Sequence, residues 1–363
     1  MIIGIDGNEA NVEKKVGIGE YAFELLKQFE KFRIQSLEFR VYLKNKPREE
    51  MPKKRDGWNY RIIGPKRFWT QFALPLDLFF HKPKPDAFFT PSHYAPRFSP
   101  VPTAVSVMDL SYIHFPHLFK TSDLYQLRNW TAYSVKKATI IFTISQASKD
   151  DIIKTYNVAE NKVIVTYPGI KKLSNMSQPT SKLNIEGDYI LFVGTLQPRK
   201  NIVRLIEAYS KLDSTTKLVI VGKKGWLYEE ILQAPKKFGV GKKVKFLDFV
   251  ADEDLPSIYK RALCFILPSL YEGFGLPVLE AMKYGCPVIT SNISSLPEAG
   301  GDAALYVDPL NVEDIAEKID ELIKDKALRE KLIKKGYEQV KKFSWEKTAK
   351  ETLKELEGLI IKD

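Results

Sequence analysis

Glu272 lies in a segment whose residue types suggest binding chemistry. An apolar run precedes Pro268 and predicts a buried strand, and the residues from Leu276 predict a helix. Pro277 is suited to a first helical turn, and Gly285 is suited to the position just after a helix. The turn between strand and helix has the sequence Glu-Gly-Phe-Gly and begins with Glu272.

Such a turn is expected to bind phosphate, because the free N–H groups of the first helical turn and the helix dipole both attract anions. Gly273 and Gly275 lack side chains, so a phosphate oxygen can approach the main chain closely. Glu272 and Glu280 flank this turn, and a carboxylate beside a phosphate site is best explained by hydrogen bonds from hydroxyl groups. One glutamate could bind the sugar of a nucleotide-sugar donor and the other a ribose. For Glu280 alone, a solvated side chain that stabilises the helix N-terminus remains an alternative.

Arg199 and Lys200 form a second candidate group, in the stretch FVGTLQPRKNI. A predicted strand ends at Gly194 there, and an amphipathic helix follows the two cations. Loops after the carboxyl ends of parallel strands line the ligand crevice of α/β sheets. Positive charges at this place would stabilise a diphosphate leaving group, although an Arg-Lys pair by itself is more often a solvated surface.

Taken together, the two stretches resemble the retaining glycosyltransferases of family 4. The similarity spans nearly the whole chain, and its most specific part is the pair of glutamates eight positions apart in EGFGLPVLEAM. The resemblance implies the α/β GT-B fold, in which two Rossmann-like, doubly wound domains face each other across a cleft. The C-terminal domain would hold the nucleotide sugar and the N-terminal domain the acceptor.

The resemblance also implies roles for single residues. Arg199 and Lys200 would bind the diphosphate, Glu272 the 3- and 4-hydroxyls of the donor sugar, and Glu280 the ribose. The main chain of the turn would contact the phosphates and the sugar, and the nucleotide base would lie near two apolar residues. These further positions are Gly273, Phe274, Gly275 and Leu276 for the turn, with Phe249 and Val250 for the base. Members of this family are taken to retain the anomeric configuration by front-face attack, without a metal.

Near the N-terminus, Gly17 and Gly19 resemble the first glycine-rich loop of the family, which approaches the donor phosphate. The same residues begin the pattern G-x-G-x-x-A, which is found in dinucleotide-binding proteins. About ten residues separate these glycines from the first predicted strand, and no acidic residue closes the next strand candidate, FRVYL. A nicotinamide enzyme is therefore disfavoured.

Two positions depart from the family pattern. Many relatives have a histidine where this chain has Met108, so no role of that histidine can be transferred, and Asp109 remains as a candidate for orienting the acceptor or the donor sugar. Asp109 could equally cap the segment that follows it. Some relatives have an arginine where Thr195 stands here, which places more of the phosphate neutralisation on the two cations that follow. His93 could contact the acceptor or be a satisfied loop residue. His114 and His117 are three positions apart with Pro116 between them, a spacing unsuited to a metal site on a helix.

The pattern of apolar runs predicts parallel strands with crossover helices in two domains. The N-terminal domain is expected over residues 1–170 and the C-terminal domain over 187–344, with a polar linker at 168–188. A helix over 345–363 is expected to pack back on the N-terminal domain. Strands are predicted in MIIGIDG, FRVYL, AFFTP, TAVSVM, ATIIFTIS, YILFVG, TKLVIVG, VKFLDFV, CFILPS and PVITS.

Positive charge is concentrated in the first half of the chain. Residues 1–180 contain 27 Lys and Arg against 17 Asp and Glu, or +10 of the total of +11. Such an excess suggests an anionic partner, which could be a phospholipid surface, a lipid phosphate, an acidic glycan or nucleic acid. A basic surface that serves only solubility is an equal alternative. The basic and aromatic stretch PKRFWTQFALPLDLFF is compatible with a membrane interface. A helix packed on the N-terminal sheet is the preferred interpretation, because Pro75 and Asp77 interrupt a continuous amphipathic face.

Several classes of protein are disfavoured. No apolar run reaches the roughly 18 residues of a membrane span, and the first residues lack a basic segment, so we expect a cytoplasmic protein, peripheral at the inner face of the membrane if it meets lipid at all. Cys264 and Cys286 lack metal-ligand spacing and are expected to be buried. No nucleic-acid-binding motif accompanies the basic residues.

The sequence therefore predicts a retaining hexosyltransferase that uses a nucleotide diphosphate sugar and a glycan or lipid-linked acceptor. Similarity of the GTLQPRKN and MDLSY stretches to mannosyltransferases of surface polysaccharide synthesis makes GDP-mannose the favoured donor. Two alternatives remain at this stage. One is a catalytically degenerate protein that binds nucleotide sugars as a scaffold, and the other is a GT-B epimerase or phosphorylase.

Overall fold

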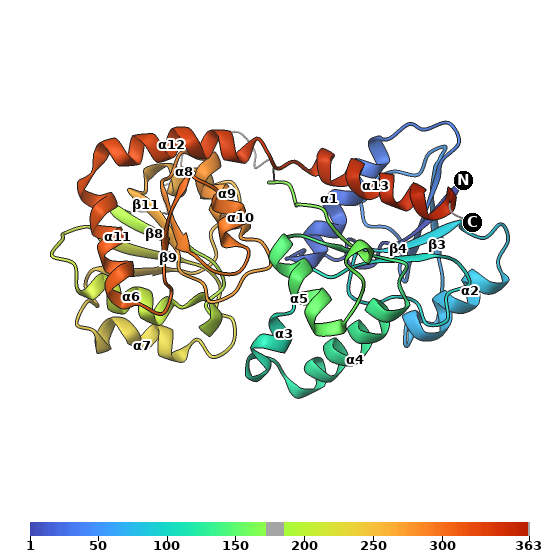
Figure 1. The fold of residues 1–363 in the computed structure, drawn as a ribbon, viewed down its shortest axis with the longest axis horizontal. Coiled ribbons are helices and arrows are strands. Elements are labelled where there is room, and N and C mark those ends of the chain that lie inside the picture. Colours follow the sequence, from blue (N-terminus) through green and yellow to red (C-terminus); the bar gives the residue numbers. More distant parts are fainter. Residues whose placement is uncertain (172–184, 362–363) are drawn as a thin grey trace. The chain divides into compact units, whose positions relative to one another are not determined.

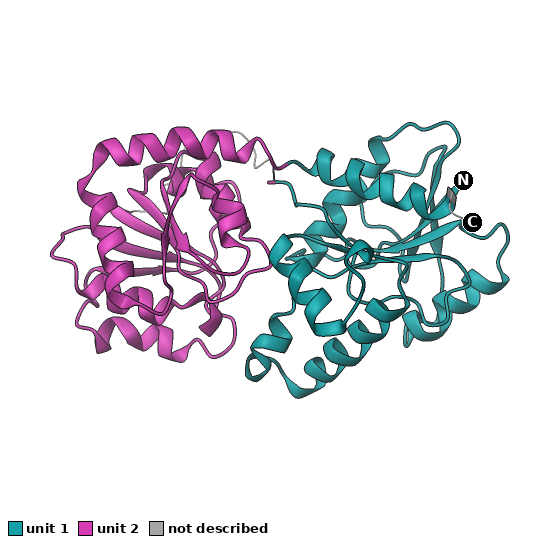
Figure 2. Ribbon diagram, in the orientation of Figure 1, with its two compact units in different colours: residues 1–169, 344–363 teal, residues 170–343 magenta. Residues whose placement is uncertain are grey.

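The computed structural model describes residues 1–171 and 185–361, and it divides into two compact units. The first unit comprises residues 1–169 and 344–363, and the second comprises residues 170–343 (Figure 2). The predicted linker at 168–188 lies mostly outside the described residues, as do the last two residues of the predicted C-terminal helix.

The first unit contains a parallel sheet of seven strands in the order β3-β2-β1-β4-β5-β6-β7. The strands are β1 (Ile2–Asp6), β2 (Glu38–Leu43), β3 (Trp58–Ile62), β4 (Ala87–Thr90), β5 (Thr103–Ser106), β6 (Ile140–Thr143) and β7 (Val163–Val165). The helices that connect them are α1 (Ile18–Lys31), η1 (Trp69–Ala73), α2 (Leu74–Phe80), α3 (Ser111–His114), η2 (Pro116–Leu118), α4 (Thr121–Lys137), α5 (Gln146–Tyr156) and η3 (Glu160–Lys162). Figure 1 shows these helices arranged around the sheet.

The second unit contains a parallel sheet of six strands in the order β10-β9-β8-β11-β12-β13. The strands are β8 (Tyr189–Val193), β9 (Lys217–Val221), β10 (Val244–Leu247), β11 (Cys264–Leu267), β12 (Val288–Ser291) and β13 (Ala304–Val307). The helices are η4 (Pro198–Lys200), α6 (Ile202–Ser210), α7 (Glu229–Lys237), α8 (Leu255–Arg261), α9 (Leu276–Lys283), α10 (Leu296–Gly300), α11 (Val312–Lys324) and α12 (Lys326–Val340). The order reverses between β8 and β11, and this switch point is where a doubly wound sheet binds ligands.

Three strands were not predicted from the sequence. Residues 58–62 mix polar with apolar side chains, β7 has only three residues, and β13 is a run of four residues whose middle two are only half-buried, so none of them forms the long apolar run typical of a buried parallel strand. All three lie at or next to a sheet edge, where a strand has a neighbour on only one side and its burial is weaker.

The last helix, α13 (Trp345–Ile361), belongs to the first unit although it follows the second in sequence. Trp345, Ala349, Leu353 and Leu356 recur at helical spacing and join the same buried cluster as the apolar face of α1. The rings of Trp345 and Tyr21 meet edge to face with centroids 5.8 Å apart. The first unit therefore contains both the segment before the second unit and the segment after it.

Replacing Leu356 by alanine is expected to destabilise the first unit by about 2–5 kcal/mol, because a fully buried leucine is removed from its core. Unfolding in urea followed by tryptophan fluorescence measures this, since Trp58, Trp69, Trp130 and Trp345 all lie in that unit. The exposed Lys354 provides a matched control on the same helix, and Lys354→Ala should change stability little. Equal stability of the two variants would contradict the packing of α13.

Candidate active site

Glu272 is positioned by the connection between β11 and α9. The turn between them ends at Gly275, whose φ of +103° is a conformation that favours glycine. A Cβ atom on Gly275 would approach Leu296 Cδ2 to 2.8 Å, so the close packing against α10 also requires glycine. The backbone of Glu272 is held as well, because Ser294 Oγ and Ser295 Oγ each donate a hydrogen bond to its carbonyl oxygen at 2.8 Å.

The two cations of the β8–α6 loop converge on this glutamate. Arg199 Nη1 lies 3.0 Å from Glu272 Oε2, and Lys200 Nζ lies 2.5 Å from Glu272 Oε1. Arg199 also donates to the carbonyl oxygen of Tyr271 at 2.6 Å, and Ser269 Oγ donates to Glu272 Oε1 at 2.6 Å. The side chains of Lys200 and Glu272 are only 9% and 8% exposed, which makes this a buried ion cluster rather than a surface pair.

The backbone brings the two loops together. The amide of Leu270 donates to the carbonyl oxygen of Arg199 at 2.8 Å. Asn201 has a left-handed backbone, with φ of 60°, and its side-chain amide donates to the carbonyl oxygens of Pro268 and Pro309 at 3.0 and 2.6 Å. Gly222 follows β9 and lies so close that a Cβ atom there would meet Gly194 O at 1.9 Å. The cations are therefore fixed at the carboxyl end of the sheet, next to its switch point.

Electrostatics keep Glu272 ionised. Burial by itself would raise its pKa, but the charges of Lys200 and Arg199 and the hydrogen bonds from Lys200 and Ser269 lower the pKa to about 2. Arg199 and Lys200 thus place two positive charges beside the one carboxylate of Glu272. Such a site attracts an anion, and the glutamate still has lone pairs with which to accept hydrogen bonds from hydroxyl groups.

Comparison with known proteins gives the family. A profile for glycosyl transferases group 1 matches residues 177–339, which contain this ion cluster. O-antigen chain mannosyltransferase B of Escherichia coli is 32% identical over 306 residues, which make up 81% of this chain and 78% of that protein. The chain belongs to the group 1 glycosyl transferases.

Two further proteins match this chain, one in part of its sequence and one in its fold. The serotype-specific mannosyltransferase WbdA of Escherichia coli is 32% identical over 228 residues, which cover 59% of this chain but only 28% of that longer protein. Sucrose-phosphate synthase from Thermosynechococcus elongatus has the same fold, with a TM-score of 0.76 at 17% identity over the full length of both chains. The predicted glycosyltransferase with two Rossmann-like domains of the GT-B type is thus confirmed.

Glu280 of the glycosyltransferase lies on α9, and its hydrogen bond is with Tyr259 rather than with a member of the ion cluster. Its Oε2 accepts a hydrogen bond from Tyr259 Oη at 3.2 Å. Burial raises the pKa of Glu280, and the bond from Tyr259 only partly offsets this effect. Near the predicted base site, Val250 is buried, whereas Phe249 is 64% exposed with Lys223 Nζ 4.2 Å from its ring centroid.

Three predicted site residues lie in the first unit. Gly17 has φ of +49° and precedes α1, and a Cβ atom on Gly19 would approach the carbonyl oxygen of Glu9 to 2.9 Å. The local backbone therefore favours glycine at both positions. Asp109 Oδ1 accepts a hydrogen bond from the amide of Ser111 at 2.8 Å, which is the capping role considered as its alternative. Asp109 follows the carboxyl end of β5, and His93 follows the carboxyl end of the neighbouring strand β4.

His93 and Met108 have different surroundings in this region. Burial lowers the pKa of His93, against the opposing charge of Asp109, and its Nδ1 has no hydrogen-bond partner within the described residues. Met108 is 8% exposed and packs in the core cluster. The methionine is therefore a core residue of this fold. His114, which had no assigned role, pairs with Asp151 at 3.0 Å.

Sequence reasoning missed the residues that support the cluster and a cavity in the first unit. Glu272 and its loop are held by Ser269, Asn201, Ser294 and Ser295. Ser269 and Asn201 lie within the two stretches singled out from the sequence but were given no role, and Ser294 and Ser295 lie outside both. The cavity has a volume of about 250 Å³ at the carboxyl ends of β1 and β4, and its lining includes Asp6, Glu9, Lys44, Tyr94 and Trp130. Its residues come from five separate segments, so no local pattern indicates it.

Among the described residues, no group of three or more His, Cys, Asp and Glu side chains is placed to hold a metal ion. Both cysteines are buried and free. Within the same residues, no helix is both long enough and apolar enough to cross a membrane.

Replacing Lys200 by methionine is expected to destabilise the second unit by about 3–5 kcal/mol, because the buried Glu272 carboxylate loses one of its two cations. The exposed pair of Lys211 and Glu313, 2.6 Å apart, offers a matched control. Lys211→Met should cost less than about 1 kcal/mol. Denaturant unfolding at neutral pH measures both values, and similar losses would mean that the buried cluster has no special weight.

The raised pKa of Glu280 predicts a pH-dependent effect of Glu280→Gln. The wild-type Glu280 side chain contributes stability below its ordinary pKa of 4.5, and this contribution is lost as pH rises through its higher folded-state pKa. The ligand-free variant should therefore be more stable than the wild type at neutral pH, with the difference vanishing as pH falls below 4.5. Unfolding curves between those pH values test this. Glu330→Gln, on the exposed surface of α12, should show no such trend.

Proposed function

We propose that this glycosyltransferase transfers mannose from GDP-mannose to a glycan or lipid-linked acceptor with retention of configuration. The observation that carries the proposal is the buried cluster in which Arg199 and Lys200 meet Glu272 beside the N-terminus of α9. Relatives named as O-antigen and serotype-specific mannosyltransferases support mannose as the sugar.

In the proposed reaction, the bond between C1 of the sugar and the diphosphate oxygen breaks and the nucleoside diphosphate leaves with the electron pair. Arg199 and Lys200 stabilise the growing negative charge, and preorganised cations contribute several kcal/mol in such sites. The acceptor hydroxyl attacks C1 on the face the diphosphate leaves, and its proton passes to a departing phosphate oxygen. Because the two cations supply the positive charge at this place, we propose that the transfer needs no metal.

Glu272 would accept hydrogen bonds from the donor sugar, since its pKa of about 2 keeps it a carboxylate at any physiological pH. Glu280 would bind the ribose, and Phe249 with Val250 would lie beside the base. Gly17 and Gly19 would approach the donor phosphates from the first unit. Each of these roles is carried over from the family resemblance.

We place the acceptor sugar in the cavity of the first unit. Asp6 and Glu9 present carboxylates and Lys44 a cation, while Tyr94 and Trp130 present aromatic rings whose centroids are 5.5 Å apart. Carboxylates bind sugar hydroxyls, and aromatic faces pack against the C–H groups of a sugar ring. Asp109 and His93, on the same sheet, would orient the attacking hydroxyl. The basic first half of the chain supports peripheral binding to an anionic membrane that carries the acceptor.

The decisive experiment compares donors and products. At 100 times its dissociation constant, a bound nucleotide sugar adds about 2.7 kcal/mol of stability, so thermal shifts with GDP-mannose, UDP-glucose and ADP-glucose identify the donor. We expect GDP-mannose to give the largest shift, an α-linked product by NMR, and a rate that EDTA leaves unchanged.

Glu272→Gln is the matched test of mechanism. It should lower kcat/KM at least about tenfold, because one charge-assisted hydrogen bond to the sugar is worth about 1.5–3 kcal/mol. Glu313→Gln, an exposed carboxylate of the same unit, should leave kcat/KM unchanged. Full activity of Glu272→Gln, or a larger shift with another donor, would refute the corresponding part of the proposal.

A further inference from the structure

The helical run from Trp69 to Phe80, formed by η1 and α2, has two apolar faces. Its inner face packs against the sheet, where Trp69, Ala73, Leu74 and Leu78 form one buried cluster with Tyr42 and Phe88. This confirms the expected packing of the helix on the N-terminal sheet. An amphipathic helix on the surface of a protein in water would carry polar residues on the face opposite the core.

The outer face is apolar instead. It consists of Phe68, Phe72, Leu76, Phe79 and Phe80, which are 51%, 60%, 54%, 42% and 79% exposed, and we call these five residues the outer stripe. They recur at spacings of three and four residues, so they lie along one side of the helix. Phe98, 74% exposed, is next to this helix, because the amide of Arg97 donates to the carbonyl oxygen of Thr70 at 3.1 Å.

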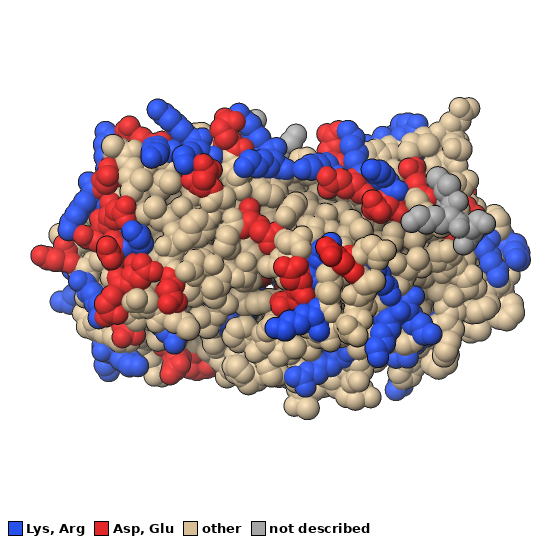
Figure 3. Space-filling view, viewed as in Figure 1, with Lys and Arg blue, Asp and Glu red and all other residues tan. Residues whose placement is uncertain are grey.

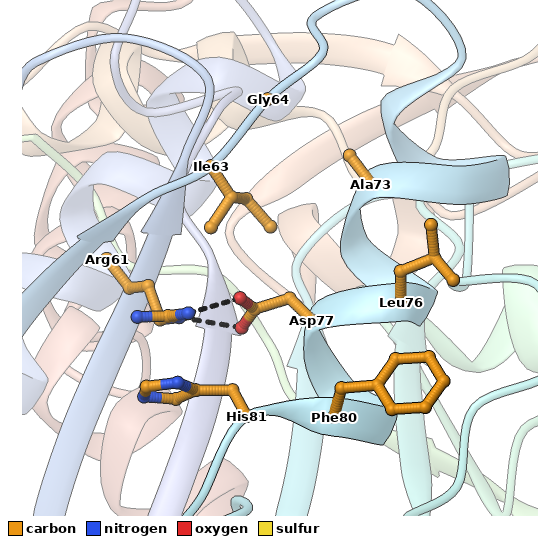
Figure 4. A pocket seen from close by; sticks show the side chains of 8 residues that line it. All are labelled: Arg61, Ile63, Gly64, Ala73, Leu76, Asp77, Phe80 and His81. Carbon is orange, nitrogen blue, oxygen red and sulfur yellow. Dashed lines mark hydrogen bonds and ion pairs between the residues drawn. The ribbon is translucent and has the colours of Figure 1, made fainter.

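Pro75 and Asp77 do not break the outer stripe, contrary to the sequence-based expectation. Pro75 is buried in the first turn of α2. Asp77 points away from the stripe and forms a two-pronged ion pair with Arg61 across a shallow cavity of about 490 Å³ (Figure 4). Leu76 and Phe80 line the same cavity, which leaves an apolar rim around a neutralised charge pair.

Two of the exposed aromatic residues have a costly backbone. Phe68 and Phe98 have φ values of 54° and 52°, in the left-handed region that bulky residues rarely adopt. Strain of this kind persists only where the surrounding structure holds it, and it is found mostly at functional sites. Here it accompanies two phenylalanines that are both exposed.

Basic residues surround the outer stripe. Residues 61–98 contain six Lys and Arg against two Asp. One of these aspartates pairs with Arg61, and the other, Asp86, accepts a hydrogen bond from the amide of Ile2. Arg67 lies 5.0 Å from the ring centroid of Phe68, and Lys84 lies 5.6 Å from that of Phe79. Figure 3 shows an uncharged surface over α2, with Lys and Arg side chains at its border.

We propose that the outer stripe is a docking face for an anionic phospholipid bilayer, on which this helix lies in the plane of the interface. Its aromatic side chains would enter the boundary between headgroups and acyl chains, and Arg67, Lys82 and Lys84 would pair with lipid phosphates. The charge of the border selects an anionic membrane over a second copy of this chain, whose own first half is strongly basic. The proposal gives a surface to the peripheral membrane binding included in the proposed function.

The test uses the full chain and two kinds of vesicle, phosphatidylcholine alone and phosphatidylcholine with about one third phosphatidylglycerol. The protein should sediment with the anionic vesicles and far less with the neutral ones, and added salt should weaken the binding. Leu76→Ser combined with Phe80→Ser should lower the partition coefficient about tenfold or more, because both side chains lose their apolar contact with lipid. Tyr125→Ser, at a residue 68% exposed on α4, is the control and should bind like the wild type.

A second pair of variants tests the charge. Arg67→Glu with Lys82→Glu should abolish the preference for anionic vesicles, whereas Lys136→Glu with Lys137→Glu, an equal change of charge on α4, should retain most of it. The proposal would be overturned if neither the stripe pair, Leu76→Ser with Phe80→Ser, nor the border pair, Arg67→Glu with Lys82→Glu, reduced binding to the vesicles. A lower molecular mass of the stripe variant in sedimentation velocity, without vesicle binding by the wild type, would assign the face to self-association instead.

These measurements need no nucleotide sugar, so they separate the docking face from the transfer reaction. Binding to anionic vesicles by a protein that transfers no mannose would leave the docking face intact and refute the donor assignment. Equal thermal midpoints of wild type and variants show that the substitutions leave the fold unchanged, which is expected because the altered side chains are exposed.

Discussion

The second unit is organised around one buried carboxylate, Glu272, between two cations from a neighbouring loop. Charges removed from water are tolerated only with good geometry and further hydrogen bonds. Here the Ser269 hydroxyl donates to the carboxylate, and the hydroxyls of Ser294 and Ser295 hold the backbone of Glu272. The same constraint fixes the loops after β8 and β11 on either side of the switch point of the sheet. In the proposed function, this preorganised cluster would meet the charged donor without rearranging, which reduces the reorganisation that transfer requires.

Glu272, in the turn before α9, and Glu280, on α9, have opposite electrostatic settings. The cations hold the pKa of Glu272 well below its ordinary value, whereas burial beside Tyr259 raises the pKa of Glu280. The first glutamate stabilises the ligand-free fold at neutral pH and the second opposes it. A destabilising carboxylate is easier to understand at a position that awaits a hydroxyl-bearing ligand than at one serving only the fold.

The first unit combines a polar cavity at its sheet edge with an apolar outer helix face. The cavity suits a sugar, and the outer stripe with its basic border suits a lipid surface. A lipid-linked acceptor has both chemistries in one molecule. The last helix, which packs on α1, ties the end of the chain into this same unit.

Local sequence patterns are enough to predict the α/β class, ten of the strands and a candidate site around Glu272, because continuous apolar runs and a glycine turn before a helix are local signals. The sequence also pointed to Arg199 and Lys200 as ligands of a diphosphate, from their place after a predicted strand and from the family resemblance, but it did not indicate that they pair with Glu272 itself. Strands β3, β7 and β13 gave no such signal, since edge strands are short or only half buried. The folded chain was needed to show which serines hold Glu272, that Met108 is a core residue, and that Pro75 and Asp77 lie away from the outer stripe. Each of these depends on contacts between segments distant in sequence, and the direction of a side chain relative to such segments is not encoded in local spacing.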